Sequence, residues 1–275
     1  MGNIQFQFQG YHVVVTGGAS GIGQAAALEF AKAGAQVAVI DRDPAQETEE
    51  KGIGLPGEIK SYRADLSKGE QVDSAAKQIL QAFDGKVDIL FCNAGVGQAL
   101  GTRGSCEKPP DQEWLRLYDI NTVGVIRTTR AFLPAMKQQK FGKIVITAST
   151  AAYRPDPVKA VYCVTKLASI QYALCLAKEL GPYNINVNVL NPSLVYTHIY
   201  STGTALALRE LYPDRFQGCT TGEEVLQRMT ESSSVFQRLQ RPEDCAYTVA
   251  FLCTEEAKEI TGQIFNVDSG TVMNL

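Results

Sequence analysis

Tyr162 and Lys166 are the two residues whose types and spacing point most directly to chemistry. They lie four residues apart in the stretch Pro157 to Leu180, whose composition predicts a helix. Residues at this spacing share one face of a helix, so a phenol and an amine can enter the same pocket. A neighbouring cation favours the phenolate, which lowers the pKa of a tyrosine and prepares it to exchange a proton with an alcohol or a carbonyl. Two unrelated helix residues would show the same spacing, so the pair needs support from the rest of the chain.

A glycine-rich turn near the start of the chain predicts a phosphate-binding site. The β-branched run His12 to Thr16 is typical of a buried strand, and a predicted helix from Gln24 to Ala33 follows it. Between them glycines let the backbone approach a pyrophosphate, and the free amides at the start of the helix bind its charge. The residues of this turn that we assign to the cofactor are Gly17, Ser20, Gly21, Ile22 and Gly23.

Asp41 ends a second predicted strand, Gln36 to Ile40, about 20 residues beyond the first glycines. At that place a carboxylate accepts hydrogen bonds from the hydroxyls of an adenosine ribose, whereas a 2′-phosphate would meet a like charge. The residue therefore favours NAD over NADP. Arg42 weakens this preference, because an arginine can stack on adenine or hold the phosphate. The alternative is that Asp41 is an ordinary loop acid or a helix cap.

Strand and helix signals go on alternating along the chain. Further strands are predicted at 58–63, 87–92, 143–149, 185–190 and 263–267, and further helices at 68–83, 111–136 and 242–254. Such alternation predicts an α/β fold, a single Rossmann-type domain over 1–275 whose doubly wound parallel sheet has helices on both faces. Ligands bind beyond the carboxyl ends of the strands in such sheets, which is where Ser149 is expected. The polar stretch Val96 to Pro110 is expected to be a surface loop.

The segment 196–240 carries two predicted helices, Ala205 to Tyr212 and Gly222 to Phe236. It has too few apolar residues for a core of its own, so we expect it to belong to the same domain. A substrate-loop lid over the site is the functional interpretation, and a surface excursion without a role is the alternative.

Composition limits the classes of partner. The net charge is −3 and there is no basic run, so nothing indicates nucleic acid. The opening residues MGNIQFQFQG lack the pattern of a secretory signal, and no later apolar run is expected to reach membrane-spanning length. We therefore expect a cytoplasmic protein whose partners are small molecules, with neither nucleic acid nor membrane among them.

Cysteine and histidine usage predicts neither disulfides nor a metal site. The seven cysteines are an odd number without a C-x-x-C pair, and they are expected to be buried thiols in a reducing compartment. The two histidines, His12 and His198, are too few and too isolated for a histidine-based metal site.

With these residues in hand, the chain resembles the short-chain dehydrogenase/reductase family over almost its whole length. The matching motifs are Thr16-Gly-Gly-Ala-Ser-Gly-Ile-Gly23, Asp65, Asn93-Ala-Gly95, Asn121, Ser149, Tyr162-x-x-x-Lys166, Pro192 to Thr197, Thr261-Gly-Gln and Val267-Asp-Ser-Gly270. One departure is Ser193, where the family usually has glycine after the proline.

The resemblance implies roles for the catalytic residues. Tyr162 would be the general acid and base, and Ser149 would orient the substrate oxygen. Lys166 would lower the pKa of the tyrosine and bind the nicotinamide ribose, and Asn121 would hold a water that relays protons to solvent. For the cofactor, the resemblance implies that Asp65 and Leu66 contact adenine, that Asn93, Ala94 and Gly95 line the groove, and that Pro192, Val195 and Thr197 lie at the nicotinamide end.

These observations predict an NAD-dependent oxidoreductase that transfers a hydride between a secondary alcohol and NAD⁺ and is reversible as a ketone reductase. The alcohol would be a sugar, polyol, cyclic alcohol or hydroxy acid. The alternatives are an NADP-dependent carbonyl reductase, and a sensor or scaffold that binds NAD(H) without catalysis.

The substrate pocket and the assembly are predicted less closely. Arg103 and Arg154 can be read as a clamp for an anionic substrate, but we expect both to be solvated surface residues. The resemblance implies that the outer faces of the helices 111–136 and 157–180 pair between subunits, giving a homotetramer or a homodimer. The expected pocket residues are Thr150, Ala152, Tyr153, Val195 and Tyr196.

Overall fold

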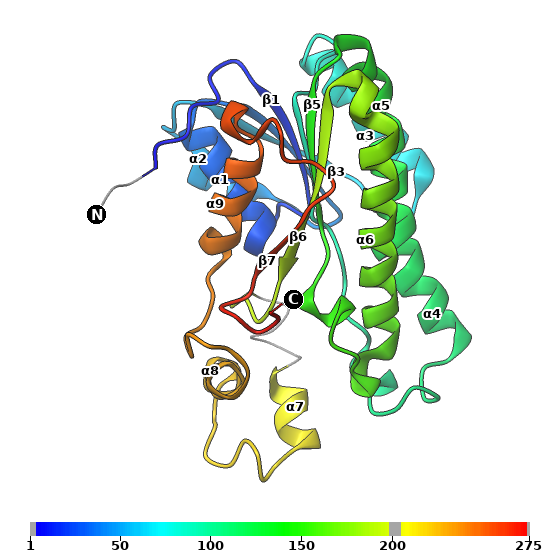
Figure 1. Ribbon diagram of the computed structural model, residues 1–275, viewed down its shortest axis with the longest axis vertical. Coiled ribbons are helices and arrows are strands. Elements are labelled where there is room, and N and C mark those ends of the chain that lie inside the picture. Colours follow the sequence, from blue (N-terminus) through cyan, green and yellow to red (C-terminus); the bar gives the residue numbers. More distant parts are fainter. Residues whose placement is uncertain (1–3, 198–204, 274–275) are drawn as a thin grey trace.

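The protein is built around one parallel sheet. The structure, a computed structural model, describes residues 4–197 and 205–273. Seven strands run in the order β3-β2-β1-β4-β5-β6-β7 (Figure 1), which confirms the predicted Rossmann-type architecture. The strands are β1 (His12–Thr16), β2 (Gln36–Asp41), β3 (Glu58–Arg63), β4 (Ile89–Cys92), β5 (Gly142–Thr147), β6 (Ile185–Pro192) and β7 (Ile264–Val267).

Both faces of the sheet are covered by helices, which explains why the strand sequences are continuously apolar. Side chains alternate along a strand, so Val13 and Val15 of β1 join one core cluster while Val14 joins the other. Helices α1 (Gly21–Lys32) and α9 (Pro242–Leu252) pack on the first face. The opposite face is covered by α3 (Gly69–Ala82), α5 (Gly124–Gln139) and α6 (Ala160–Leu180) (Figure 1).

Two helical regions differ from the expectation. The helix predicted at 111–136 is α4 (Asp111–Tyr118), a π-helical turn (Asp119–Val123) and then α5, which continues to Gln139 around Pro134. Apolar residues continue from α4 into α5, so the sequence pattern was interpreted as one helix and the extra residue of the π-helical turn was missed. A short helix, α2 (Gln46–Gly52), was missed because its sequence QETEEKG has no apolar period.

Helix α6 is more apolar than expected. The helical stretch Pro157–Tyr183, which contains it, is long and apolar enough to cross a membrane by length and composition alone. The expectation that no apolar run reaches that length is therefore wrong. Packing explains part of this: Val161, Ile170 and Leu180 are buried against the rest of the protein. Val164 and Leu167, which are also apolar, are about half exposed.

The cysteines are free thiols, but not all are buried. Cys92, Cys219, Cys245 and Cys253 are buried as expected, whereas Cys106 and Cys175 are exposed. The expectation of seven buried thiols is wrong for these two residues.

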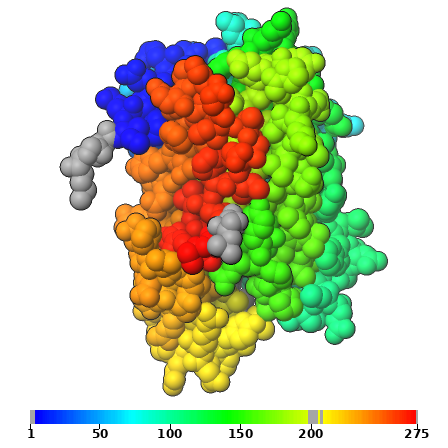
Figure 2. Space-filling model, in the orientation of Figure 1, coloured from blue at the N-terminus to red at the C-terminus, as the bar shows by residue number. Residues whose placement is uncertain are grey.

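The segment after β6 projects from the end of the molecule where the strands terminate (Figures 1 and 2). It contains α7 (Ala205–Leu211) and α8 (Gly222–Ser233), close to the predicted ranges. Phe216, Val225 and Leu226 are fully or almost fully buried in a small apolar cluster of their own, so the expectation that the segment lacks any core was too strong.

The C-terminal turn holds the end of this segment. The Ser269 carbonyl accepts hydrogen bonds from the amides of Val235 (2.9 Å) and Phe236 (3.3 Å), just beyond α8. Closer to the sheet, the amide of Tyr196 donates to the Gln240 carbonyl (2.9 Å). The segment is therefore attached at both of its described ends. The role of 196–240 as a lid over the site stays a prediction, since residues 198–204 lie outside the described residues.

Candidate active site

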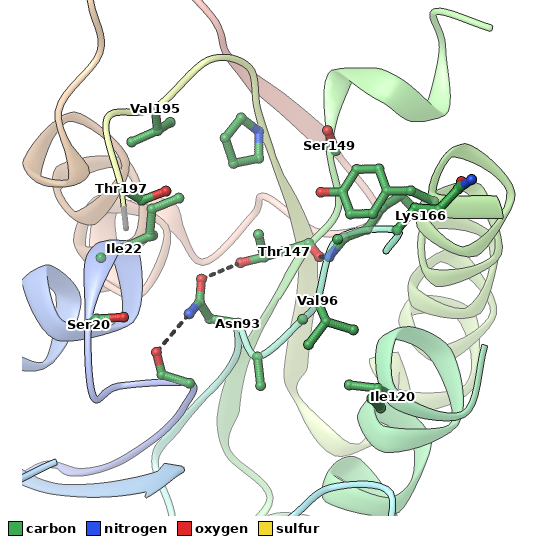
Figure 3. A pocket seen from close by; sticks show the side chains of 18 of the residues that line it. Ser20, Ile22, Asn93, Val96, Ile120, Thr147, Ser149, Lys166, Val195 and Thr197 are labelled. Carbon is green, nitrogen blue, oxygen red and sulfur yellow. Dashed lines mark hydrogen bonds between the residues drawn. The ribbon is translucent and has the colours of Figure 1, made fainter. Parts of the chain in front are cut away.

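A large pocket lies at the carboxyl ends of the strands. Its volume is about 630 Å³, within the range of sites for small molecules and cofactors. Figure 3 shows Ser149 and Lys166 on one side, facing Val195, Thr197, Ser20 and Ile22 across the cavity. The predicted residues that line it are Gly17, Ser20, Gly21, Ile22, Asp41, Arg42, Asp65, Leu66, Asn93, Ala94, Gly95, Ser149, Tyr162, Lys166, Pro192, Val195 and Thr197.

The glycine turn is shaped for close approach. Gly17 has a φ of +70°, and a Cβ there would lie 2.7 Å from the Cα of Ala94. A Cβ on Gly23 would overlap the Gly17 carbonyl, so Gly23 serves the packing of α1 on the turn and does not line the pocket. Helix α1 begins at Gly21, so its unpaired amides open into the cavity. This arrangement fits the pyrophosphate of a dinucleotide.

Asn93 ties the strand ends together. Its side-chain nitrogen donates to the carbonyls of Thr16 and Gly17 (both 3.3 Å), and its side-chain oxygen accepts from the Thr147 hydroxyl (3.3 Å), as Figure 3 shows for Thr147. The Thr16 hydroxyl in turn accepts from the amides of Asn93 (3.0 Å) and Ala94 (3.1 Å). Three turns, after β1, β4 and β5, are thus held in one fixed arrangement.

Tyr162 and Lys166 lie on the same side of α6, as their spacing predicts. The amine of Lys166 is 5.8 Å from the centre of the Tyr162 ring, and it donates to the Thr147 carbonyl at 3.0 Å. Lys166 is 3 % exposed, and this burial lowers its pKa from 10.5 to about 8. Both residues line the pocket together with Ser149, so the three chemical groups meet in one cavity.

Ser149 follows β5 and caps a short 3₁₀ turn, Thr150–Ala152. Its hydroxyl oxygen accepts a hydrogen bond from the amide of Ala151 at 3.2 Å. That bond fixes the oxygen and leaves the hydroxyl hydrogen available to a substrate oxygen in the pocket.

Asn121 does not line the pocket but supports it from the π-helical turn. Its side-chain oxygen accepts from the Val96 amide (2.8 Å), and its nitrogen donates to the Val96 carbonyl (3.0 Å) and to Thr165 (3.1 Å). A Cβ on Gly95 would lie 3.3 Å from this oxygen and 3.1 Å from the Lys166 amine. Asn121 therefore lies behind Gly95 and near Lys166, while its role in holding a water stays a prediction.

Asp41 reaches the pocket from the end of β2. One carboxylate oxygen accepts from the Ala19 amide in the glycine turn (2.9 Å), and the other accepts from the Asp43 amide (3.0 Å). The carboxylate is thereby fixed beside the turn and keeps lone pairs for further donors. The Arg42 side chain is 60 % exposed and lies 3.4 Å from the Asp43 carboxylate.

Some predicted residues lie elsewhere, and others were missed. Thr150, Ala152, Tyr153 and Tyr196 do not line the pocket. Arg154 is exposed as expected, but Arg103 is only 8 % exposed and lines the cavity, so its prediction as a solvated surface residue is wrong. The loop Val96 to Pro110 folds inward because side chains of α4 and of the π-helical turn bind its backbone, which a loop sequence alone does not reveal. Lining residues without a sequence signal include Gln98, Asp156, Lys159, Leu208 and Met229.

Within the described residues, no group of three or more His, Cys, Asp and Glu side chains is arranged to hold a metal ion. The titratable side chains in the pocket lining are Asp41, Arg42, Asp43, Asp65, Arg103, Asp156, Lys159, Tyr162 and Lys166.

Comparisons with known proteins agree with this geometry. A family model described as enoyl-(acyl carrier protein) reductase matches residues 17–272. The human dehydrogenase/reductase SDR family member 4 is 33 % identical over 264 residues, 95 % of this chain and 87 % of the relative. The structure of L-sorbose reductase from Gluconobacter frateurii complexed with NADPH and L-sorbose is 28 % identical, covers 99 % of this chain and 100 % of its own, and has a TM-score of 0.88. That of NAD⁺-bound xylitol dehydrogenase is 29 % identical, covers 96 % and 99 %, and has a TM-score of 0.82.

Replacing Lys166 with methionine should stabilise the protein by about 2 kcal/mol below pH 8. Holding a charged amine in this site disfavours folding, since its pKa is lowered from 10.5 to about 8, and the lost bond to Thr147 offsets part of the gain. Between these two pKa values the folded wild-type protein has released a proton that the unfolded chain still holds. Wild-type stability therefore rises with pH in that window, and the advantage of the variant shrinks.

Urea unfolding at about pH 7 and pH 9.5 measures this difference. Lys258→Met, at a side chain that is 60 % exposed, is the matched control and should show no such change with pH. A Lys166→Met protein that is less stable than the wild type at pH 7 would contradict the account.

Proposed function

Because the chain belongs to the short-chain dehydrogenase/reductase family, we propose that this oxidoreductase is NAD-dependent and transfers a hydride between a secondary alcohol and NAD⁺ in either direction. The alcohol is a sugar, polyol, cyclic alcohol or hydroxy acid. One observation carries the proposal: Ser149, Tyr162 and Lys166 line the same pocket as the glycine turn. A proton-transferring group and a cofactor cradle therefore serve one cavity.

A bound nicotinamide would supply the hydride acceptor or donor. For the proton, the phenolate of Tyr162 accepts the hydroxyl proton of the alcohol during oxidation, and the resulting phenol donates a proton to the substrate oxygen during reduction. Ser149 donates its hydroxyl hydrogen to the same substrate oxygen and fixes its position beside the phenol. These two groups act only on the oxygen atom, so the same machinery serves both directions.

Lys166 supports both tasks from behind the pocket. Its bond to the Thr147 carbonyl uses one of the three ammonium hydrogens. The other two can donate to the ribose of the cofactor, and the positive charge acts on Tyr162. A positive charge beside the phenol favours the phenolate. Binding of a ribose and formation of a phenolate in turn favour the charged form of the Lys166 amine. The site is therefore most active when the ribose is bound and Tyr162 is a phenolate. Proton exchange with solvent passes through the water that we assign to Asn121.

Asp41 supports the choice of NAD. Its carboxylate lines the adenosine end of the pocket and is fixed by two backbone amides. A 2′-phosphate would bring a second negative charge to the same place. The relatives differ in this respect, since the sorbose reductase structure contains NADPH and the xylitol dehydrogenase structure contains NAD⁺. The alternative, an NADP-dependent carbonyl reductase, would require Arg42 to outweigh Asp41.

A sensor or scaffold that binds NAD(H) without catalysis is a second alternative. It would have no use for the cavity-lining hydroxyl of Ser149 or for a buried amine at Lys166, which burial makes costly to keep charged. The presence of both groups beside Tyr162 favours catalysis.

Tyr162→Phe should lower kcat by about 10²- to 10⁴-fold, because the variant loses the proton donor and acceptor but keeps the ring. NADH binding, followed by fluorescence titration, should stay within about threefold. Turnover is measured as NADH absorbance with a panel of secondary alcohols. Tyr153→Phe, at an exposed residue outside the pocket lining, is the matched control and should be fully active. Retained activity in Tyr162→Phe would refute the assignment.

The wild-type enzyme should use NADH with a higher kcat/KM than NADPH. Asp41→Asn should raise the NADPH-to-NADH ratio of kcat/KM by at least about tenfold, because it removes the charge that repels a 2′-phosphate while retaining an oxygen for the Ala19 amide. Steady-state rates with the two cofactors measure the ratio. A wild-type preference for NADPH would show that Arg42 prevails.

We also propose that the protein is a cytoplasmic homotetramer or homodimer. Apolar side chains on the outer surfaces of α4 and α6 support pairing: Leu115 is 70 % exposed, and Val164 and Leu167 are about half exposed. Burying such a surface against a second copy would remove it from water. Sedimentation should show a tetramer, and Leu167→Glu should shift the protein toward smaller species. A wild-type monomer at micromolar concentration would overturn the proposal.

A further inference from the structure

We propose that Arg103 binds a carboxylate of the substrate, so that the alcohols oxidised by this enzyme are hydroxy acids and the ketones it reduces are keto acids. This inference rests on the proposed function and narrows its substrate class. It starts from an arginine whose sequence suggested a surface position and whose side chain lies instead in the wall of the catalytic pocket.

The guanidinium is held against the backbone of its own loop. Its Nε donates to the Gln98 carbonyl at 2.9 Å, and a Cβ on Gly97 would lie 3.4 Å from one of its terminal nitrogens. With 8 % of the residue exposed, few orientations are open to the side chain. A guanidinium has five donors in a rigid fork, so it can hold several acceptors at once and matches the two oxygens of a carboxylate.

The loop itself is fixed by side chains from α4. The Glu113 carboxylate accepts from the Ala99 amide (2.6 Å) and pairs with Arg116 (2.8 Å). Arg116 also donates to the Gly97 carbonyl at 3.2 Å. Arg103 is therefore presented by a loop with several anchors, as a preorganised binding group requires.

A chain of contacts places Arg103 on the substrate side of the pocket. Gln98, whose carbonyl holds the guanidinium, accepts through its side chain from the amide of Val161 at 3.2 Å. Val161 directly precedes Tyr162 in α6. Gly104, which follows Arg103 in the loop, donates its backbone amide to the Val158 carbonyl (3.4 Å). Asp41, which we assign to the adenosine end, lies at the end of β2, two strands away from β4, which precedes the loop of Arg103.

The charges around this part of the cavity favour an anion. Glu113 faces two guanidinium groups, those of Arg116 and Arg103, and their influence helps to keep its pKa below the usual value, with the Arg116 hydrogen bond as the largest cause. Lys159 and Asp156, also in the lining, form an ion pair at 3.7 Å and cancel each other. The guanidinium of Arg103 is itself positively charged, and burial strengthens its attraction for the carboxylate of a bound substrate.

The test compares secondary hydroxy acids with their neutral amides, for example 2-hydroxybutyrate, 3-hydroxybutyrate and 4-hydroxypentanoate and the matching amides, with NAD⁺ and the wild-type enzyme. We expect at least one acid to exceed its amide about 10- to 100-fold in kcat/KM, mainly through KM, as the loss of one charged hydrogen bond would predict. Arg103→Met should lower that ratio by a similar factor, and Arg103→Lys should restore part of it. Arg154→Met, at an exposed arginine outside the lining, is the matched control and should leave the ratio unchanged.

A binding measurement keeps the inference testable if Arg103→Met is unstable. Butyrate should bind the wild-type enzyme–NADH complex in calorimetry at least tenfold more tightly than butyramide. Equal turnover of amides and acids, equal binding of butyrate and butyramide, or a preference for hydroxyalkyl phosphates over carboxylates would overturn the inference while leaving the oxidoreductase assignment intact. Failure of every alcohol, acidic or neutral, to reduce NAD⁺ would instead overturn the proposed function.

Discussion

The hydrogen bond from the Lys166 amine to the Thr147 carbonyl is the interaction on which the site depends. It joins α6, which carries the phenol of Tyr162, to β5, which is followed by Ser149. An amine with 3 % of its residue exposed keeps a charge only where its partners are fixed. The geometry of the strand ends is therefore a condition for the chemistry, and stability is given up to maintain it.

The same strand ends position the dinucleotide side of the pocket. Thr147 contacts Lys166 through its carbonyl and Asn93 through its hydroxyl, and Asn93 contacts the glycine turn. A continuous set of hydrogen-bonded residues thus runs from the glycine turn to the Lys166 amine. Parallel pairing places the carboxyl ends of β1, β4 and β5 next to one another, which is why residues far apart in the chain meet there.

Much of this could be predicted from the sequence, because the signals were local. Runs such as His12 to Thr16 are apolar along their whole length when both faces of a sheet are covered, and the Tyr162–Lys166 spacing follows from helix geometry. Features set by contacts between distant segments could not be predicted. The inward fold of the loop around Arg103 depends on Glu113 and Asn121, which lie in another element. The π-helical turn lies between two helical stretches whose apolar residues suggested one continuous helix, and α2 is too polar to show an apolar period.

The C-terminal turn has a practical consequence for work on this protein. Its residues 268–273 follow β7 at the catalytic end of the sheet, and the Ser269 carbonyl holds the chain just beyond α8. The first described residues lead into β1 at the amino ends of the strands, the opposite end of the sheet from the pocket (Figure 1). A deletion that removes residues 268–273 would remove the Ser269 carbonyl and release the chain just beyond α8. This turn should therefore be kept intact in protein used for kinetic measurements.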